Sequence, residues 1–193
     1  MSITQERDTT VIGQRLLRRE DPALLTGEAK YTNDLAIPGA LHLAVLRSPY
    51  AHARIKSIDV ADAKAMPGVI AVYTGKDLHS TWAAPMPCAW PVTPDMKNPA
   101  HYPIALDKVC YVGDGVAAVV ATSDAAARDA LDAIDVVYEP LAAVTDLEEA
   151  LADKTIIHEA LGTNKSYTWN LKVEGSEGAV DAAFKNAAFT VKE

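Results

Sequence analysis

The stretch VAAVVATSDAAARDALDAIDVVY, residues 116–138, decides the fold of this chain. Its first six residues, 116–121, are small or β-branched and apolar, as in a buried strand. Ser123 then stands where a helix N-cap is needed, and apolar residues recur at helical spacing as far as Ile134. The β-branched run at 136–138 predicts a returning strand. The stretch therefore predicts one strand–helix–strand unit.

An earlier segment follows the same plan. Residues 41–47 and 53–58 read as strands, and 69–73 is a further apolar, β-branched run. Between them, Asp59 is a suitable N-cap for a short alanine-rich helix that ends near Ala65. The Pro-Gly pair after that helix stops it, because proline has no N–H and glycine permits a reversal. Two such units predict an α/β (α+β) fold, with right-handed crossovers if the joined strands are parallel.

A glycine-rich turn precedes the deciding stretch. Gly113-Asp114-Gly115 separates the apolar runs 108–112 and 116–121, which predicts a β-hairpin. The triplet is not a dinucleotide-binding fingerprint, because a third glycine is absent and a strand rather than a helix follows. The turn is therefore expected to be structural.

Composition and charge exclude several classes of protein. With 193 residues, 49% of them hydrophobic and 23% charged, the chain fits one globular domain, or one with tails. A formal net charge of -8 leaves no basic stripe for a nucleic acid. The N-terminus lacks the apolar stretch of a signal peptide, and no run approaches the ~18 apolar residues that a membrane span requires. We therefore expect a cytoplasmic protein without a nucleic-acid partner or a membrane-spanning segment.

No motif in the sequence supports catalysis by itself. Cys88 and Cys110 form no CxxC pair and have no histidine at zinc-like spacing, which argues against zinc or iron–sulfur ligation. Both are expected to be free thiols, as in a reducing compartment. The five histidines are scattered, and scattered histidines are more often surface or strand residues than metal ligands. No catalytic, cofactor-binding or metal-binding residue is therefore assigned.

The segment 82–103 is unusual because it contains six of the eleven prolines. Proline fixes φ and disfavours helix in the preceding residue, so this loop should be extended and stiff. It also carries Trp82, Met86, Trp90 and Met96, which would expose apolar surface unless something covers them. Two interpretations remain: an arm that lies over its own core, or a wall or lid that faces another domain.

The C-terminal tail predicts a strand, a turn and a helix. Residues 167–171 alternate like a strand, 175–178 resemble a turn, and the apolar positions between 180 and 187 have the spacing of an amphipathic helix. Residues 189–191 then begin another strand close to the end of the sequence. We expect either a chain cut at a boundary or a strand that completes a sheet in a partner.

Several phrases of the sequence resemble one enzyme family. They occupy residues 27–34, 47–55, 66–69, 111–114 and 137–144. Together, in this order and spacing, they are similar to the opening of the large, molybdenum-cofactor-binding subunit of the molybdenum hydroxylases, which include xanthine dehydrogenase, aldehyde oxidase and aerobic carbon monoxide dehydrogenase. The phrases at 84–91, 98–105 and 161–164 most resemble carbon monoxide dehydrogenase large chains.

The resemblance implies an N-terminal arm at 1–23, an α/β hammerhead domain at 24–145, and a linker with the start of the molybdopterin-binding domain at 146–193. It implies two strand–helix–strand units in the hammerhead-type domain and a C-terminal strand/helix tail. The family's pterin contacts, base glutamate and active-site loop lie later in the subunit, so none maps onto this chain. The matching stretch borders the substrate funnel, which puts forward three funnel-lining residues: Met86, Cys88 and Trp90.

The resemblance leads to one hypothesis, with an alternative from another class. The leading hypothesis is a fragment or split-gene part of a molybdenum hydroxylase large subunit, with a structural and substrate-access role in oxidising a small substrate with water-derived oxygen. The complete subunit would hold molybdenum on molybdopterin cytosine dinucleotide, and partner subunits would carry FAD and [2Fe-2S] clusters. This chain alone would hold no cofactor and be inactive. The alternative is a stand-alone hammerhead binding or scaffold module without redox activity.

Overall fold

The structure, a computed structural model, describes residues 12–88, 90–171 and 175–192. The chain divides into two compact units, Met1–Ala40 and Leu41–Glu193. The first unit contains the helix α1 (Asp21–Thr26) and the 3-10 helix η1 (Thr32–Asp34). Gly27 ends α1 in the left-handed region, with φ 75°, where a side chain would be strained. Residues 1–38 are polar and lack sustained hydrophobic periodicity, which predicts an extended arm, and the structure adds these two short helices.

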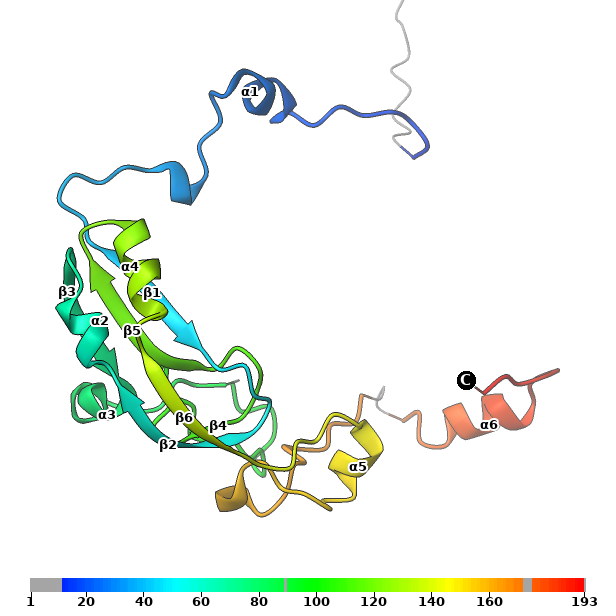
Figure 1. Ribbon diagram of the computed structural model, residues 1–193. Helices are drawn as coiled ribbons and strands as arrows, with labels where there is room; N and C mark the ends of the chain where they lie inside the picture. Colours follow the sequence, from blue (N-terminus) through cyan, green and yellow to red (C-terminus); the bar gives the residue numbers. More distant parts are fainter. Residues whose placement is uncertain (1–11, 89, 172–174, 193) are drawn as a thin grey trace, which may run out of the picture. The chain divides into compact units, whose positions relative to one another are not determined.

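The second unit contains all six strands found among the described residues (Figure 1). Its elements are, in chain order, β1 (His42–Arg47), β2 (Ala53–Asp59), α2 (Ala61–Ala65), β3 (Val69–Thr74), α3 (Gly75–Leu78), η2 (His79–Thr81), β4 (Lys108–Val109), β5 (Gly115–Ala121), α4 (Asp124–Leu131), β6 (Asp135–Pro140), α5 (Leu147–Leu151), η3 (Glu159–Leu161) and α6 (Ala179–Lys185). None of the helices in the described ranges is long and apolar enough to cross a membrane.

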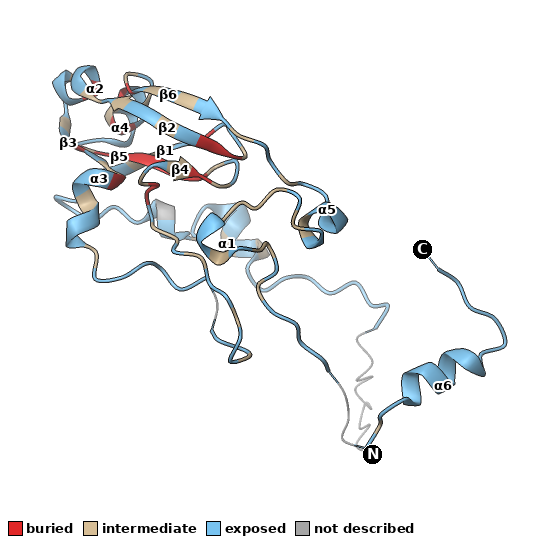
Figure 2. Cartoon of the chain, turned by 90° about the horizontal axis from the view of Figure 1, so that it is seen from below, coloured by how far each residue is buried: buried red, intermediate tan, exposed pale blue. Residues whose placement is uncertain are grey.

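The strands form two three-stranded antiparallel sheets. Sheet A has the order β1-β5-β3, and sheet B has the order β4-β2-β6. β5 is the central strand of sheet A and the most buried strand of the chain, as its apolar sequence predicts. Figure 2 shows the buried residues, in red, concentrated on β5. The predicted α+β fold class is confirmed.

The two strand–helix–strand units connect the sheets instead of returning to one of them. α2 leads from β2 in sheet B to β3 in sheet A, and α4 leads from β5 in sheet A to β6 in sheet B. The strand pairs are antiparallel, so the condition for right-handed parallel crossovers is not met. The predicted hairpin is also wrong, because β4 pairs with β2 while β5 pairs with β1 and β3. A local pattern reveals strands but not which sheet each one joins.

Small side chains fill the core between sheet A and the helices α2 and α4. Its buried members are Ala63, Val72, Ala117, Val119, Ala121, Ala127, Ala130 and Ile134. The predicted apolar stripe of α4 is therefore confirmed. So is the predicted N-cap, since Ser123 Oγ accepts the N–H of Ala126 at 3.1 Å. Asp59 caps α2 from one residue further out, by accepting the N–H of Ala61 at 2.9 Å.

A second buried cluster joins sheet B to β5, and it consists of Ala53, Ala105, Val109 and Val116. Gly75, the first residue of α3, allows the segment before β4 to reach this cluster. A Cβ at Gly75 would lie only 2.2 Å from the carbonyl oxygen of Ala105. The chain between the proline-rich loop and β4 is thus seated directly on the backbone of α3.

The proline-rich loop doubles back on itself. The N–H of Met86 donates to the carbonyl of His101 at 2.7 Å, which forms an isolated β-bridge. At the base of the loop the rings of Trp82 and Tyr102 are stacked, with centroids 5.3 Å apart and planes inclined by 15°. Trp90, further along, is 89% exposed. The described residues 83–88 and 90–103 of the loop form no helix, as the prolines predict, and Trp90 is left uncovered.

The tail contains its predicted helix, because α6 begins one residue before the amphipathic segment 180–187 and covers most of it. The predicted strands at 167–171 and 189–191 are wrong, since neither segment has strand conformation. A strand is stable only when a neighbouring strand accepts its hydrogen bonds, and the described ladders include neither segment. Residues 172–174, between the first strand and the turn, lie outside the described part.

Candidate functional site

A cavity of about 570 Å³ beside β4 is the candidate functional site. Its walls come from the proline-rich loop, the β4–β5 connection and the segment before η3. The lining residues are Cys88, Pro99, Ala100, His101, Tyr102, Ala105, Leu106, Asp107, Lys108, Cys110, Tyr111, Asp114 and His158. Apolar walls with a few converging polar groups are typical of sites that admit small molecules.

The β4–β5 connection forms one wall, and the buried Asp114 holds its shape. One carboxylate oxygen of Asp114, which is 5% exposed, accepts the N–H of Cys110 at 3.1 Å. From β1, Arg47 Nη1 donates to the carbonyl of Gly113 at 2.8 Å. Burial, with the nearby Asp114 carboxylate, raises the pKa of Tyr111. The Tyr111 phenol therefore stays protonated at neutral pH, and its oxygen lies 3.5 Å from His101 Nε2.

Two free thiols face this cavity. Cys88 is exposed, and its Sγ lies 3.8 Å from the carbonyl oxygen of Pro99. Cys110 is half-buried, and burial raises its pKa. A thiol with a raised pKa is a weak nucleophile and a weak metal ligand. Cys110 therefore contributes an apolar wall rather than a reactive group.

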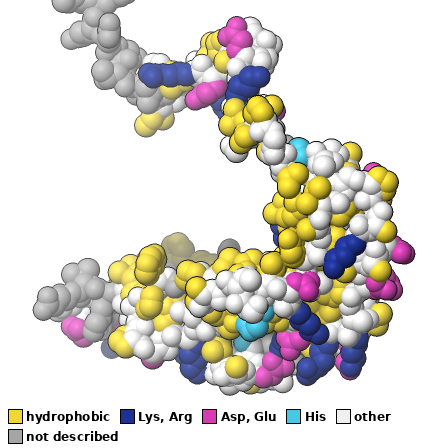
Figure 3. Space-filling model, turned by 90° about the vertical axis from the view of Figure 1, so that its left-hand side faces the viewer, with side chains coloured by type: hydrophobic (Ala, Val, Ile, Leu, Met, Phe, Trp, Pro, Cys, Tyr) yellow, Lys and Arg dark blue, Asp and Glu magenta, His cyan; other side chains and the backbone are white. Residues whose placement is uncertain are grey.

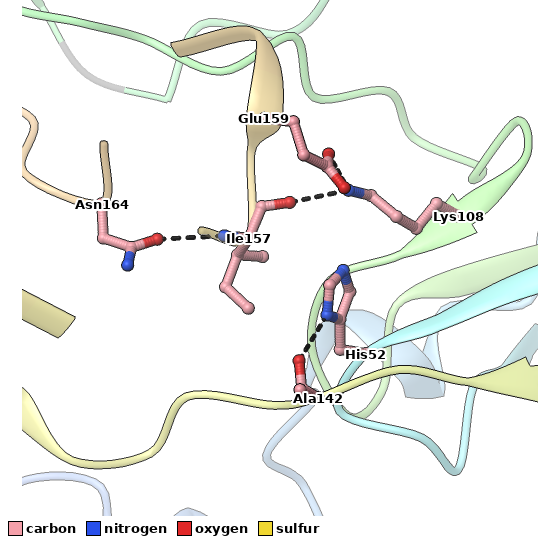
Figure 4. A network of polar contacts seen from close by, with 6 residues as sticks. All are labelled: His52, Lys108, Ala142, Ile157, Glu159 and Asn164. Carbon is pink, nitrogen blue, oxygen red and sulfur yellow. Dashed lines mark hydrogen bonds and ion pairs between the residues drawn. The ribbon is translucent and has the colours of Figure 1, made fainter. Parts of the chain in front are cut away.

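A polar network closes the cavity on the side of η3 (Figure 4). Lys108 of β4 donates to the carbonyl of Ile157 at 2.7 Å and forms an ion pair with Glu159. The hydrogen bond from Lys108 lowers the pKa of Glu159, so this carboxylate is ionised at neutral pH. Burial, and then the positive charge of Lys108, lowers the pKa of His158. His158 therefore lines the cavity as a neutral imidazole.

His52 connects the β1–β2 turn to the chain after β6. Its Nδ1 lies 2.7 Å from the carbonyl oxygen of Ala142, so Nδ1 carries the hydrogen of this bond. The ring is 5% exposed, and Nε2 has no partner among the described residues. Figure 4 shows Nε2 on the side of the ring that faces Lys108. The imidazole thus lies beside the network that closes the cavity.

Asn164 organises a smaller neighbouring cavity of about 300 Å³. Its side-chain oxygen accepts the N–H of Ile157 at 3.0 Å, and its Nδ2 donates to the carbonyl of Thr155 at 2.7 Å. Asp153, with φ 51° in the left-handed region, accepts from the Asn164 N–H at 2.7 Å and from Thr163 Oγ1 at 2.6 Å. These two hydrogen bonds lower the pKa of Asp153. The Thr-Asn pair therefore has a structural role in holding the loop.

The three predicted funnel residues lie in different surroundings. Cys88 lines the main cavity. Met86 is 41% exposed and Trp90 is 89% exposed, and neither lines this cavity or the smaller one. A funnel role for the three residues stays a prediction.

Sequence reasoning missed most of the cavity wall, including His101, Tyr111 and His158. Two phrases that carry the family resemblance, 98–105 and 111–114, contain several of these lining residues. Their spacing in the sequence, however, does not predict that they meet. The segment around His158 is attached to them by the Lys108 network and by hydrogen bonds with Lys97, for which the sequence holds no motif.

The fold and the cavity together define a class of domain. Two antiparallel sheets are linked by crossover helices, and the cavity beside β4 is lined by a protonated phenol, a neutral imidazole and an unactivated thiol. A family profile described as "Aldehyde oxidase and xanthine dehydrogenase, a/b hammerhead domain" matches residues 26–142. This chain belongs to that family.

Similar proteins extend the match over nearly the whole chain. The nicotine 6-hydroxylase large subunit of Paenarthrobacter nicotinovorans is 38% identical over 94% of this chain and 21% of its own length. The carbon monoxide dehydrogenase large chain of Hydrogenophaga pseudoflava is 33% identical over 98% of this chain and 24% of its own length. The chain thus spans less than a quarter of the length of these curated relatives.

Solved structures agree with this assignment. The quinoline 2-oxidoreductase from Pseudomonas putida 86 has a TM-score of 0.64 and 42% identity, and the match covers 78% of this chain and 19% of that one. A Cu,Mo-CO dehydrogenase has a TM-score of 0.68 and 32% identity, covering 92% of this chain and 23% of that one. The chain therefore corresponds to one part of the large subunits of molybdenum-dependent oxidoreductases.

Proposed function

We propose that this chain supplies structure and part of the substrate-access route in the large subunit of a molybdenum hydroxylase. The observation that carries the proposal is the asymmetry of the matches. The relatives align with 94–98% of this chain but use only 21–24% of their own length to do so. The segment is therefore a constant portion of much larger subunits, and its cavity is bordered by the loop in which the funnel residues are predicted.

In this proposal the molybdenum cofactor belongs to the rest of the large subunit. Molybdopterin cytosine dinucleotide would supply the redox chemistry there, a small substrate would be oxidised with oxygen from water, and FAD and [2Fe-2S] clusters would lie on partner subunits. The wall of the main cavity does not fit such a cofactor. Lys108 is the lysine in the wall of the main cavity, and its ammonium already contacts Ile157 and Glu159. A pyrophosphate would find no free cation there.

The domain boundaries are part of the same proposal. Residues 1–23 would form an arm, 24–145 the hammerhead domain, and 146–193 the linker and the beginning of the molybdopterin-binding domain. The hydrogen bonds between Lys108 and the segment 157–159 support this division, because they attach the start of the linker to sheet B. The linker would then leave the hammerhead domain at a fixed position.

The access role can be tested at Cys88, which is the predicted funnel residue in the cavity wall. In a complete large subunit that contains this segment, Cys88→Phe should narrow the cavity and lower kcat/KM by about tenfold, with the molybdenum content unchanged. Val92→Phe is the matched control, because Val92 is 51% exposed on the same loop and does not line the cavity. Equal kcat/KM values for the two variants would contradict an access role.

The absence of a cofactor from this segment can be tested on the isolated chain. Elemental analysis and an absorption spectrum of the purified protein should show no stoichiometric molybdenum or iron and no flavin band. Any one of these signals would contradict the proposed division of roles. A cofactor-free chain that binds a ligand or a partner on its own, without redox activity, would instead support the scaffold or binding alternative.

A further inference from the structure

One face of sheet A is entirely apolar. Opposite residues in an antiparallel register share a face, and alternate residues of one strand lie on opposite faces. The face away from α2 and α4 consists of two rows across the three strands: Leu43, Val120 and Ala71 in one row, and Val45, Ala118 and Tyr73 in the other. Ala117, Val119 and Ala121 project to the other face, into the helix-covered core.

This second face, called here the open face, is only partly covered. Leu43 is 65% exposed and Tyr73 is 40% exposed. Figure 3 shows hydrophobic side chains, in yellow, gathered on the left-hand side of this part of the molecule. An antiparallel sheet that keeps one face in water normally alternates apolar and polar residues. The strands β1, β3 and β5 lack that alternation, because their residues on the open face are apolar as well. Such a face is typical of a surface that another polypeptide covers.

We propose that the open face is the docking surface for the remainder of the large subunit, the part that lies outside this chain. The inference rests on the proposed function, and it names the surface through which this chain would pack against the rest of the subunit. More than three quarters of the length of each curated relative lies outside the matched segment, so a large covalently linked neighbour is available. The six side chains of the open face carry no charge, and the partner surface that covers them is therefore apolar and uncharged as well.

The size of the open face favours a tethered partner over a second copy of this chain. Four of its six side chains are alanine or valine, and together the six offer far less than the roughly 800 Å² per partner that stable dimers bury. A partner in the same polypeptide needs less contact area, because the linkage raises its effective concentration. The geometry therefore matches packing between domains of one subunit.

Hydroxyl-radical footprinting measures the exposure of these side chains directly. The two samples are the isolated chain and a chimeric large subunit, in which this chain replaces the matching segment of the Pseudomonas putida quinoline 2-oxidoreductase. Leu43 and Tyr73 should be oxidised in the isolated chain and protected by about tenfold or more in the chimera. Equal oxidation of both residues in the two samples would overturn the docking surface.

Substitution provides a second measurement. Leu43→Lys should leave the isolated chain folded, because the side chain is largely exposed, but lower the yield of assembled chimera by about tenfold or more, since the ammonium would be buried without a partner. Val137→Lys is the matched control, as Val137 is 49% exposed on β6 of sheet B. Equal yields of the two variants would overturn the inference.

The remaining outcomes separate this inference from the proposed function. A chimera that assembles and oxidises quinoline while Leu43 and Tyr73 stay exposed would overturn the docking surface alone. An unaltered chimera that fails to assemble, although the isolated chain is folded by circular dichroism, would count against both. Protection of Tyr73 that appears in the isolated chain as its concentration rises, and disappears in Leu43→Lys, would assign the open face to a second copy and overturn the proposal.

Discussion

The core under α4 and the loop segment 150–165 around Asn164, called here the loop layer, are stabilised by different forces. The core consists mainly of alanine and valine side chains, with Ile134, and these pack closely without polar partners. The loop layer has few buried apolar groups and is held by directional hydrogen bonds that Asn164 and Lys108 donate and Asp153 accepts. The core should therefore unfold only together with the whole domain, whereas the loop layer can open locally.

The largest expected effect is on the core. Ala127 is fully buried between α4 and sheet A, so Ala127→Leu forces three extra carbons into filled space. We expect a loss of about 2–3 kcal/mol in the free energy of unfolding, measured by denaturant titration. Ala125→Leu is the control, because Ala125 lies exposed on the same helix. A similar loss in both variants would show that helix propensity, not packing, is responsible.

The next effect is on the loop layer. Asn164→Ala removes the partners of the Ile157 N–H and the Thr155 carbonyl. Local opening of residues 150–165 should become easier by about 1–2 kcal/mol, which hydrogen exchange would detect as faster exchange in that segment. The midpoint of global unfolding should change little. If the free energy of global unfolding falls as much as the free energy of local opening, the two regions form one cooperative unit. Asn98→Ala, at an exposed position, is the control.

The reactivity of the two cavity thiols tests whether the cavity wall is more rigid than the proline-rich loop. Cys88 is exposed on the loop, while Cys110 is half-buried after β4 and its pKa is raised by burial. Alkylation of the native protein should therefore modify Cys110 more slowly than Cys88, by about tenfold or more, as followed by mass spectrometry. After denaturation both should react alike. Equal rates in the native protein would mean that the cavity wall opens as readily as the loop.

The smallest effect concerns pH. The hydrogen bond from Lys108 lowers the pKa of Glu159 below its ordinary value of 4.5, so the ion pair stabilises the loop layer above that value. This contribution is lost as the pH falls through the lowered pKa. Glu159 is 61% exposed, and the contribution should stay below about 1 kcal/mol. Exchange of residues 157–161, corrected for intrinsic rates, should rise at acidic pH, and in Glu159→Gln this extra rise should be absent.

The same contrast explains what the sequence could predict. β5, α4 and the stripe from Ala127 to Ile134 follow from local periodicity, because the core is built from residues at fixed spacings. The pairing of β4 with β2 does not, since the choice between two sheets depends on contacts distant in sequence. The cavity shares this limitation. Cys88, His101 and His158 meet only through loops whose shape is set by side-chain-to-backbone hydrogen bonds, and such bonds leave no periodic trace.

The antiparallel pairing of β1 with β5 has a consequence for how the chain folds during synthesis. Leu43 lies opposite Val120, so β1 cannot pair until β5 has been synthesised. At roughly 5–20 residues per second, the intervening chain takes on the order of ten seconds to emerge from a ribosome. During that interval the apolar strand β1 is unpaired and accessible to chaperones or to aggregation. Such non-local pairing also predicts slow refolding in vitro.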